Sequence, residues 1–161
     1  MDCRSNRPVD WEALVTENEN RLYRAALAML GSRQEAEDAV QDTFLRYLEK
    51  APDQLDSPAA WLMRVLVNRC RDLLRTRGVK GTVSLMEEIP VPGPEERQEL
   101  EELYSLPLQD RAVIHLYYYE GWSTAQVARI LGVRESTVRS RLFRARGKLK
   151  QLIIEGNHDN I

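Results

Sequence analysis

Apolar residues recur every three or four positions along most of this chain, which is the spacing of an α-helix that buries one face. Ala36, Val40, Phe44 and Tyr47, for example, would lie on the same side of one helix. Valine, isoleucine and threonine do not alternate with polar residues over any long window, so the pattern indicates no strand. We therefore predict an all-α fold, with helices over residues 10–31, 32–50, 57–77, 95–105, 107–120, 124–131 and 135–155.

Helix-capping signals and one stretch rich in glycine and proline divide the chain into two parts. Ser32 with Glu35 three residues later forms a capping box, and Ser57 followed by proline is typical of a helix start. Residues 78–94 contain three glycines and three prolines and keep no helical period, which is typical of an extended linker. We expect two small helical domains, over residues 8–78 and 95–156, joined by a flexible linker over residues 79–94.

The charged residues, 30% of the 161, are unevenly distributed although the formal net charge is only −2. Residues 1–77 carry 12 basic and 13 acidic side chains, residues 78–104 carry 2 and 7, and residues 105–161 carry 9 and 5. Within residues 129–150, eight basic side chains accompany a single acid, Glu135. Positive charge concentrated in this way favours a polyanionic partner.

Other function classes are disfavoured by what the chain lacks. No apolar run approaches the about 20 residues that cross a bilayer, and the first residues lack the apolar segment of a signal peptide. We therefore expect a cytoplasmic protein. Two cysteines and two histidines are too few for a disulfide framework or a zinc site, so we expect no metal and no cofactor. No nucleophile–base pair or glycine-rich phosphate loop is recognisable, which predicts a binding protein rather than an enzyme.

Residues 123–149 have the spacing of a helix-turn-helix unit. Ala128 would lie where two helices cross, Gly132 would make the turn, and Val138 would anchor the second helix. A rotation of about 100° per residue gives this second helix an outward face. That face consists of Ser136, Arg139, Ser140 and Phe143, with Arg144 on its flank.

The outward face suits the major groove of DNA, where arginine can bond guanine and an apolar group can contact a thymine methyl. Phosphate contacts, which position a protein without specifying sequence, would come from Arg141, Arg146, Lys148 and Lys150. The alternative interpretation is a charged, solvated helix with one exposed phenylalanine.

Two further surfaces are predicted in the first domain. On the second helix, Leu45 lies among polar residues, namely Asp38, Gln41, Asp42 and Glu49. An aliphatic side chain ringed by carboxylates favours a basic protein partner, although a plain solvated acidic face remains the alternative. On the third helix, one face gathers Trp61, Arg64, Asn68, Arg71, Asp72 and Arg75. Tryptophan beside arginines can stack unpaired bases, unless Trp61 instead folds into the core.

These segments resemble the extracytoplasmic-function (ECF) sigma factors, the smallest class of bacterial RNA polymerase initiation subunit. The resemblance covers about residues 10–155. In the first domain it rests on AEDAVQDTFLRYL (36–48) and SPAAWLMRVLVNRCRDLLRTR (57–77). In the second it rests on LPLQDRAVIHLYYYEGWSTAQVARILGVRESTVRSRLFRARGKL (106–149).

The resemblance implies three binding surfaces and three partners: core RNA polymerase, promoter DNA and an anti-sigma factor, which in this family is often membrane-anchored. The implied polymerase-binding residues are Asp38, Gln41, Asp42 and Leu45. Those implied for unpaired bases of the minus-ten promoter element are Trp61, Arg64, Asn68, Arg71 and Arg75. Those implied for the minus-thirty-five element are Ser136, Thr137, Arg139, Ser140, Arg141, Phe143 and Arg144.

The expected function is therefore that of an alternative sigma factor, which directs core polymerase to promoters and stabilises promoter opening. A conventional helix-turn-helix regulator would explain residues 123–149 equally well, but it would not explain the surfaces of the first domain. An adaptor that binds only protein would not need the basic second domain.

Overall fold

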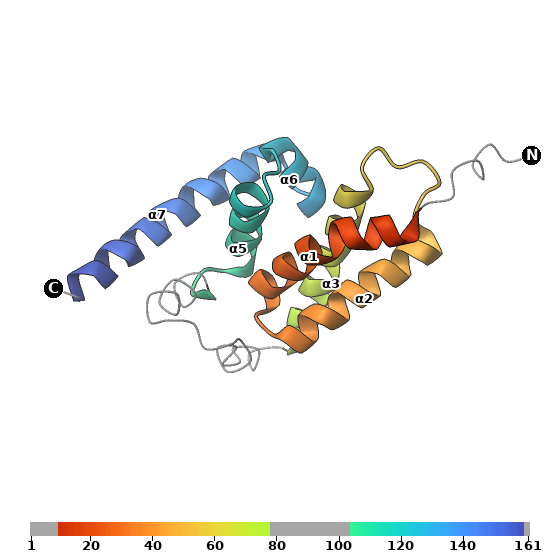
Figure 1. Cartoon of the computed structure of the whole chain (residues 1–161). Helices are drawn as coiled ribbons and strands as arrows, with labels where there is room; N and C mark the ends of the chain where they lie inside the picture. Colours follow the sequence, from red (N-terminus) through yellow and green to blue (C-terminus); the bar gives the residue numbers. More distant parts are fainter. Residues whose placement is uncertain (1–9, 78–103, 160–161) are drawn as a thin grey trace, which may run out of the picture.

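The computed structural model of the chain describes residues 10–77 and 104–159, and it is helical as the sequence predicted (Figure 1). No strand occurs in these two ranges. The first domain contains α1 (Trp11–Leu30), α2 (Arg33–Lys50) and α3 (Pro58–Arg77). The second contains α5 (Leu108–Ile114), a π-helical turn η4 (His115–Tyr119), α6 (Thr124–Leu131) and α7 (Glu135–Asp159). The predicted linker over 79–94 and nearly all of the helix predicted over 95–105 lie outside the described residues.

Local capping interactions account for the helix boundaries in the first domain. The side chain of Ser32 accepts a hydrogen bond from the Glu35 backbone N–H at 3.3 Å, and Ser57 accepts one from Ala60 at 3.2 Å. Gly31 ends α1 in the left-handed conformation, at φ 68°, where its N–H donates to the Leu27 carbonyl. These are the interactions that satisfy the unpaired backbone groups of a helix end.

Two sequence expectations about the second domain differ from the structure. The helix expected over residues 107–120 is divided, because the α-helix ends at Ile114 and a wider π-helical turn follows. The last helix ends at Asp159, four residues beyond the expected end. In the part of the chain that the structure describes, no helix has the length and apolar character needed to span a bilayer.

The core of the first domain lies where α1, α2 and α3 meet. Leu22, Met29, Leu62 and Leu66 are almost fully buried there. Cys70 belongs to the same core, and burial raises the pKa of its thiol to about 12. In the second domain the buried residues come from all of its helices, and they include Val113, Leu116, Val127, Val138 and Leu142.

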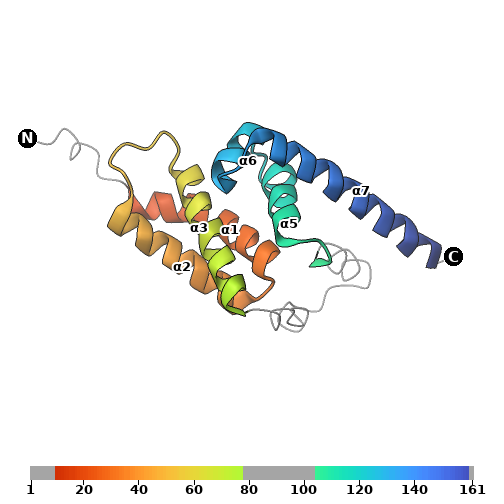
Figure 2. The ribbon, with the colours of Figure 1, turned by 180° about the vertical axis from the view of Figure 1, so that it is seen from behind.

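The sequence left the relative placement of the two domains open, and the structure packs them against each other (Figure 2). Helix α3 lies against α6, and α1 lies against α5 and η4. The Tyr104 hydroxyl donates to the Leu27 carbonyl at 2.7 Å, and Arg111 donates to the Met29 carbonyl at 2.8 Å. One apolar cluster is continuous through both domains.

Candidate nucleic-acid interface

The turn between α6 and α7 is built by local interactions. Ser123 caps α6 by accepting from the Gln126 N–H at 3.1 Å, while its own N–H donates to the Gln126 side chain at 2.9 Å. Gly132 adopts φ 68°, a left-handed conformation that costs glycine little. Ala128 and Val138 are buried between the two helices, as the sequence predicted. These contacts fix the angle at which α7 leaves the domain.

The outward face of α7 is largely free for a partner. Phe143 is 79% exposed, the highest exposure among the large apolar side chains of the described residues. Ser136, Arg139, Ser140 and Arg144 are also exposed. Because a phenylalanine this exposed contributes little to folding, its position among arginines favours a contact with a partner outside the chain.

One member of this face is already oriented within the protein. Arg139 pairs with Glu135 at 2.9 Å, and Thr124 donates to the same carboxylate at 2.8 Å. The hydrogen bond from Arg139, followed by that from Thr124, lowers the pKa of Glu135. The pair holds the Arg139 side chain against the first turn of α7, and the bond from Thr124 links that turn to the start of α6.

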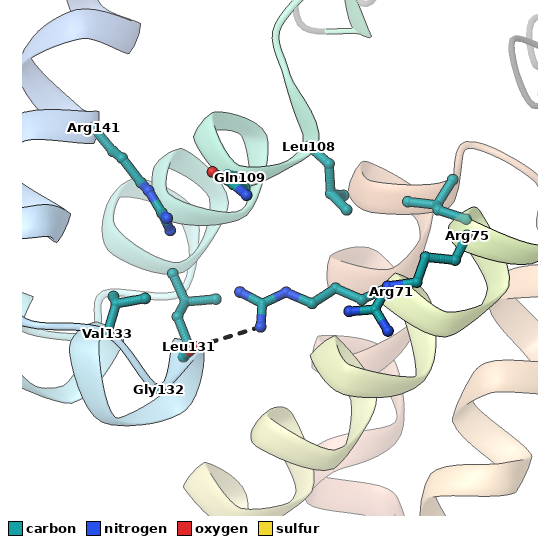
Figure 3. Close-up of a pocket in the computed structure, with 9 residues that line it drawn as sticks. Arg71, Arg75, Leu108, Gln109, Leu131, Gly132, Val133 and Arg141 are labelled. Atoms are coloured by element: carbon teal, nitrogen blue, oxygen red, sulfur yellow. Dashed lines mark hydrogen bonds between the residues drawn. The ribbon is translucent and has the colours of Figure 1, made fainter. Parts of the chain in front are cut away.

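Two residues predicted for this surface lie elsewhere on α7. Thr137 is half-buried. Arg141 is also half-buried and points into a cavity between the domains, toward Arg71 (Figure 3). Helical periodicity gave the angle of Arg141 around α7, but not the presence of the first domain on the far side of the cavity. The structure therefore separates Arg141 from the exposed face that carries Phe143.

The polar face of α2 is exposed and has an apolar centre. Asp38 and Gln41 are exposed, and Leu45 is 56% exposed. Leu48, which the sequence analysis did not single out, is 62% exposed one turn further along. Two exposed leucines on one helix form an apolar surface that a protein partner can cover.

A groove of about 330 Å³ continues this surface toward α3. Asp42 and Leu45 line it from α2, and Asn68 and Arg69 line it from α3. Arg69, another residue that the sequence analysis missed, pairs with Asp42 at 2.8 Å. The structure therefore places Asn68 beside the predicted polymerase-binding residues as well as on the helix predicted to take bases. The negative charge expected at Asp42 is offset by this arginine.

Trp61 combines the two roles that the sequence allowed, because its side chain lies partly in the core and partly at the surface. It is half-buried, and its ring meets that of Tyr47 edge to face with the centroids 5.5 Å apart. Tyr47 in turn contacts Trp11, so α1, α2 and α3 share one aromatic cluster at the start of α3. One part of the indole supports the fold, and the remainder is open to solvent.

The arginines of α3 divide into two groups. Arg64 and Arg75 are exposed. Arg71 is half-buried at the domain boundary, where it donates to the Leu131 carbonyl at 3.4 Å. Burial, and then the nearby charges of Arg141 and Arg75, lower the pKa of Arg71. The structure therefore places Arg71 beside the turn of the second domain.

A buried carboxylate joins the domains on the other side of this boundary. The Glu120 side chain is 2% exposed and pairs with Arg21 at 2.8 Å and with His115 at 3.1 Å. Arg21 also lies over the Trp122 ring, 5.2 Å from its centroid. Burial lowers the pKa of His115, in opposition to the attraction of Glu120. Within the described ranges, no group of three histidine, cysteine or acidic residues could hold a metal ion.

Comparisons with known proteins agree with this division into domains. Residues 14–79 match the family described as Sigma-70 region 2, and residues 97–149 match the family described as Sigma-70, region 4. The chain is 36% identical over 146 residues to the ECF RNA polymerase sigma factor SigL of Mycobacterium tuberculosis. This alignment covers 83% of this chain and 82% of that relative. It is 32% identical over 157 residues to the ECF RNA polymerase sigma factor SigE of Mycolicibacterium smegmatis. This alignment covers 89% of this chain and 61% of that relative.

Two solved structures have the same arrangement of helices. The sigma factor RpoE in complex with the anti-sigma factor NepR from Bartonella quintana matches with a TM-score of 0.76 and 25% identity, over 89% of this chain and 96% of that one. CnrH in complex with the cytosolic domain of CnrY matches with a TM-score of 0.71 and 30% identity, over 94% and 92%.

Proposed function

Since this chain belongs to the ECF sigma factors, which direct RNA polymerase to promoters and are not enzymes, we propose that three of its surfaces divide the work of initiation. The second domain reads duplex DNA of the minus-thirty-five element. The third helix of the first domain takes unpaired bases of the minus-ten element. The face of α2 binds the core polymerase.

The exposed face of α7 carries the first assignment, and Phe143 is the single observation on which it depends most. A 79% exposed aromatic ring beside Arg139 and Arg144 can contact a thymine methyl while the arginines bond guanine. The hydroxyl groups of Ser136 and Ser140 add hydrogen-bond donors on the same face of α7. Arg141 and Thr137, although predicted for this element, have a smaller part because they are half-buried.

The second assignment uses α3. The open part of Trp61 offers a surface on which an unpaired base can stack, and base stacking contributes about 1–3 kcal/mol per base. Arg64, Asn68 and Arg75 are exposed and can hold the strand. Arg71 would join them only after it releases the Leu131 carbonyl, to which it is now bonded.

The third assignment rests on the exposed leucine pair of α2. Leu45 and Leu48 would be covered by an apolar part of the polymerase, and Asp38, Gln41 and Asp42 would contact polar groups around it. The ion pair between Asp42 and Arg69 would then lie at the edge of the contact with the polymerase, next to the groove.

Regulation and cellular location complete the proposal. One of the two related structures holds the sigma factor RpoE bound to the anti-sigma factor NepR, which supports an anti-sigma partner for this chain. Its place of action is the cytoplasm, where polymerase and promoter DNA meet. The assignment rests on the family, together with the basic second domain.

Run-off transcription tests the proposal. The promoter is first identified by mapping transcript starts in cells that overproduce the chain. Purified core polymerase is then supplied with that promoter, and we expect transcripts only when the protein is added. Transcripts that do not depend on it would contradict the initiation role and favour a conventional regulator.

A matched pair of variants tests the assignment of Phe143. Phe143→Ala should abolish protection of the minus-thirty-five element while the unfolding temperature stays unchanged. Tyr119→Ala removes another aromatic ring of the same domain, 74% exposed, which has no assigned DNA contact. Equal loss of promoter binding in both variants would show that Phe143 has no specific part in recognition.

A further inference from the structure

A cavity of about 520 Å³ lies between the two domains, where α3 faces α5, α6 and α7 (Figure 3). Three arginines line it, Arg71 and Arg75 from α3 and Arg141 from α7. Apolar side chains, including Leu108, Leu131 and Val133, form other parts of its wall. Its volume lies in the range of about 300–1,000 Å³ that is typical of small-molecule sites.

Two of the three guanidinium groups, those of Arg71 and Arg141, have no ion pair within the described residues. No carboxylate is among the described residues that line the cavity. Arg141 has a buried Nη1 atom with no hydrogen-bond partner in the described part of the chain. Arg75 is 80% exposed and forms an ion pair with Asp72 on the same helix at 3.8 Å.

Arg71 does not relieve this imbalance. Its hydrogen bond to the Leu131 carbonyl satisfies one N–H of five but brings no negative charge. Burial, and then the nearby charges of Arg141 and Arg75, lower the pKa of Arg71, so both of these arginines repel it. Like charges gathered in a partly buried space are unfavourable unless an anion joins them.

We propose that this cavity binds a small phosphorylated molecule, with its phosphates on the three arginines and the rest of the molecule against the leucine and valine side chains. Guanidinium groups suit phosphate because they donate two parallel hydrogen bonds to its oxygens. The apolar wall favours a molecule of nucleotide size over an inorganic ion. Because Arg71 and Arg75 belong to one domain and Arg141 to the other, the ligand links the domains.

A consequence follows for DNA binding, and this consequence rests on the proposed function. Arg71 and Arg75 are also among the residues proposed to hold the minus-ten strand. A ligand on them would therefore compete with that strand and stabilise the packed arrangement of the domains. Binding itself requires neither polymerase nor promoter, so its test is separate from the transcription assay.

Isothermal titration of the full-length chain tests the site, with inorganic pyrophosphate and ADP as probes at fixed ionic strength. We expect saturable binding of one molecule per chain, with ADP bound more tightly because its adenosine part contacts the apolar wall. In the double variant R75A/R141A, affinity should fall about tenfold or more, since each arginine contributes charge-assisted hydrogen bonds.

The control is R33A/R129A, which removes one exposed arginine from each domain, neither of them in the cavity. It changes the net charge equally and should alter affinity less than about twofold. Unfolding temperatures of both variants establish that they remain folded. Absence of saturable binding to either probe, or an equal loss in the control variant, would overturn the proposal. So would binding of a ten-residue single-stranded oligonucleotide without binding of pyrophosphate, because the cavity would then belong to the nucleic-acid path alone.

Discussion

The ion pair between Arg21 and Glu120 is expected to contribute measurably to stability, because it joins the two domains through a buried carboxylate. The two residues are 99 positions apart in the sequence, and their atoms approach to 2.8 Å. Replacement of Arg21 by methionine retains most of the aliphatic stem and removes the charge. Glu120, with its side chain 2% exposed, would lose the partner that lies nearest to its carboxylate.

The expected cost follows from burial and from the partners that remain. Removal of one partner from a fully buried pair costs about 3–5 kcal/mol. The Arg21 side chain is 35% exposed, and Glu120 keeps His115 at 3.1 Å and Arg24 at 3.9 Å. We therefore expect a loss of roughly 1–2 kcal/mol, equivalent to a decrease in the unfolding temperature of roughly 2–8 °C.

Thermal unfolding at pH 7.5 measures this loss, and a double-mutant cycle isolates the pair. R21M and E120Q should each destabilise, and the double variant should be less destabilised than their sum by about 1 kcal/mol. Arg24→Met is the control, since that side chain is 62% exposed and lies farther from the same carboxylate. Additive effects in the cycle, or an equal loss in R24M, would refute the reasoning.

Three further predictions concern single positions. Gly132→Ala should cost about 1 kcal/mol in urea unfolding, since φ is 68° and nothing lies within 4 Å of the added Cβ, and a larger loss would mean a steric clash. Cys70, with its pKa raised to about 12, should react with iodoacetamide at pH 8 only as the chain unfolds, and peptide mapping without denaturant would reveal any earlier reaction. Burial lowers the pKa of His115 below its ordinary 6.5, so the unfolded chain binds the proton better and stability should fall as pH drops below about 6.5. H115Q should flatten this slope in unfolding measured between pH 5 and 7.5, and an unchanged slope would assign it to other groups.

The features that the sequence predicted well depend on neighbours along the chain. Ser32 and Ser57 cap helices through residues three positions away, and Gly132 makes its turn from its own conformational freedom. Phe143 could be placed outward because the opposite face of α7 was already occupied by buried aliphatic residues such as Val138. In each case residues within a few positions along the chain contain the information needed.

The features that could not be predicted depend on which surfaces meet in space. Arg141 is half-buried because it enters a cavity that α3, α5 and α6 also line, and no periodicity within α7 reveals this. Arg21 and Glu120 belong to no motif, so nothing in the sequence marks them as partners. Trp61 is shared between the aromatic cluster and solvent, a division that a face-by-face analysis of one helix could not make.

The wide turn at His115–Tyr119 decides which way the chain faces as it enters the helix-turn-helix unit. The Glu120 N–H bonds to the His115 carbonyl, five residues back, at 3.0 Å. In a regular α-helix, side chains five positions apart point roughly 140° away from each other, so His115 and Glu120 could not touch. The π-helical turn thus contains one residue more than a regular α-helical turn would. Deletion of a single tyrosine from the run of three would remove this extra residue and place the glutamate four positions after His115 in a regular α-helix, where it would still face His115 and Arg21.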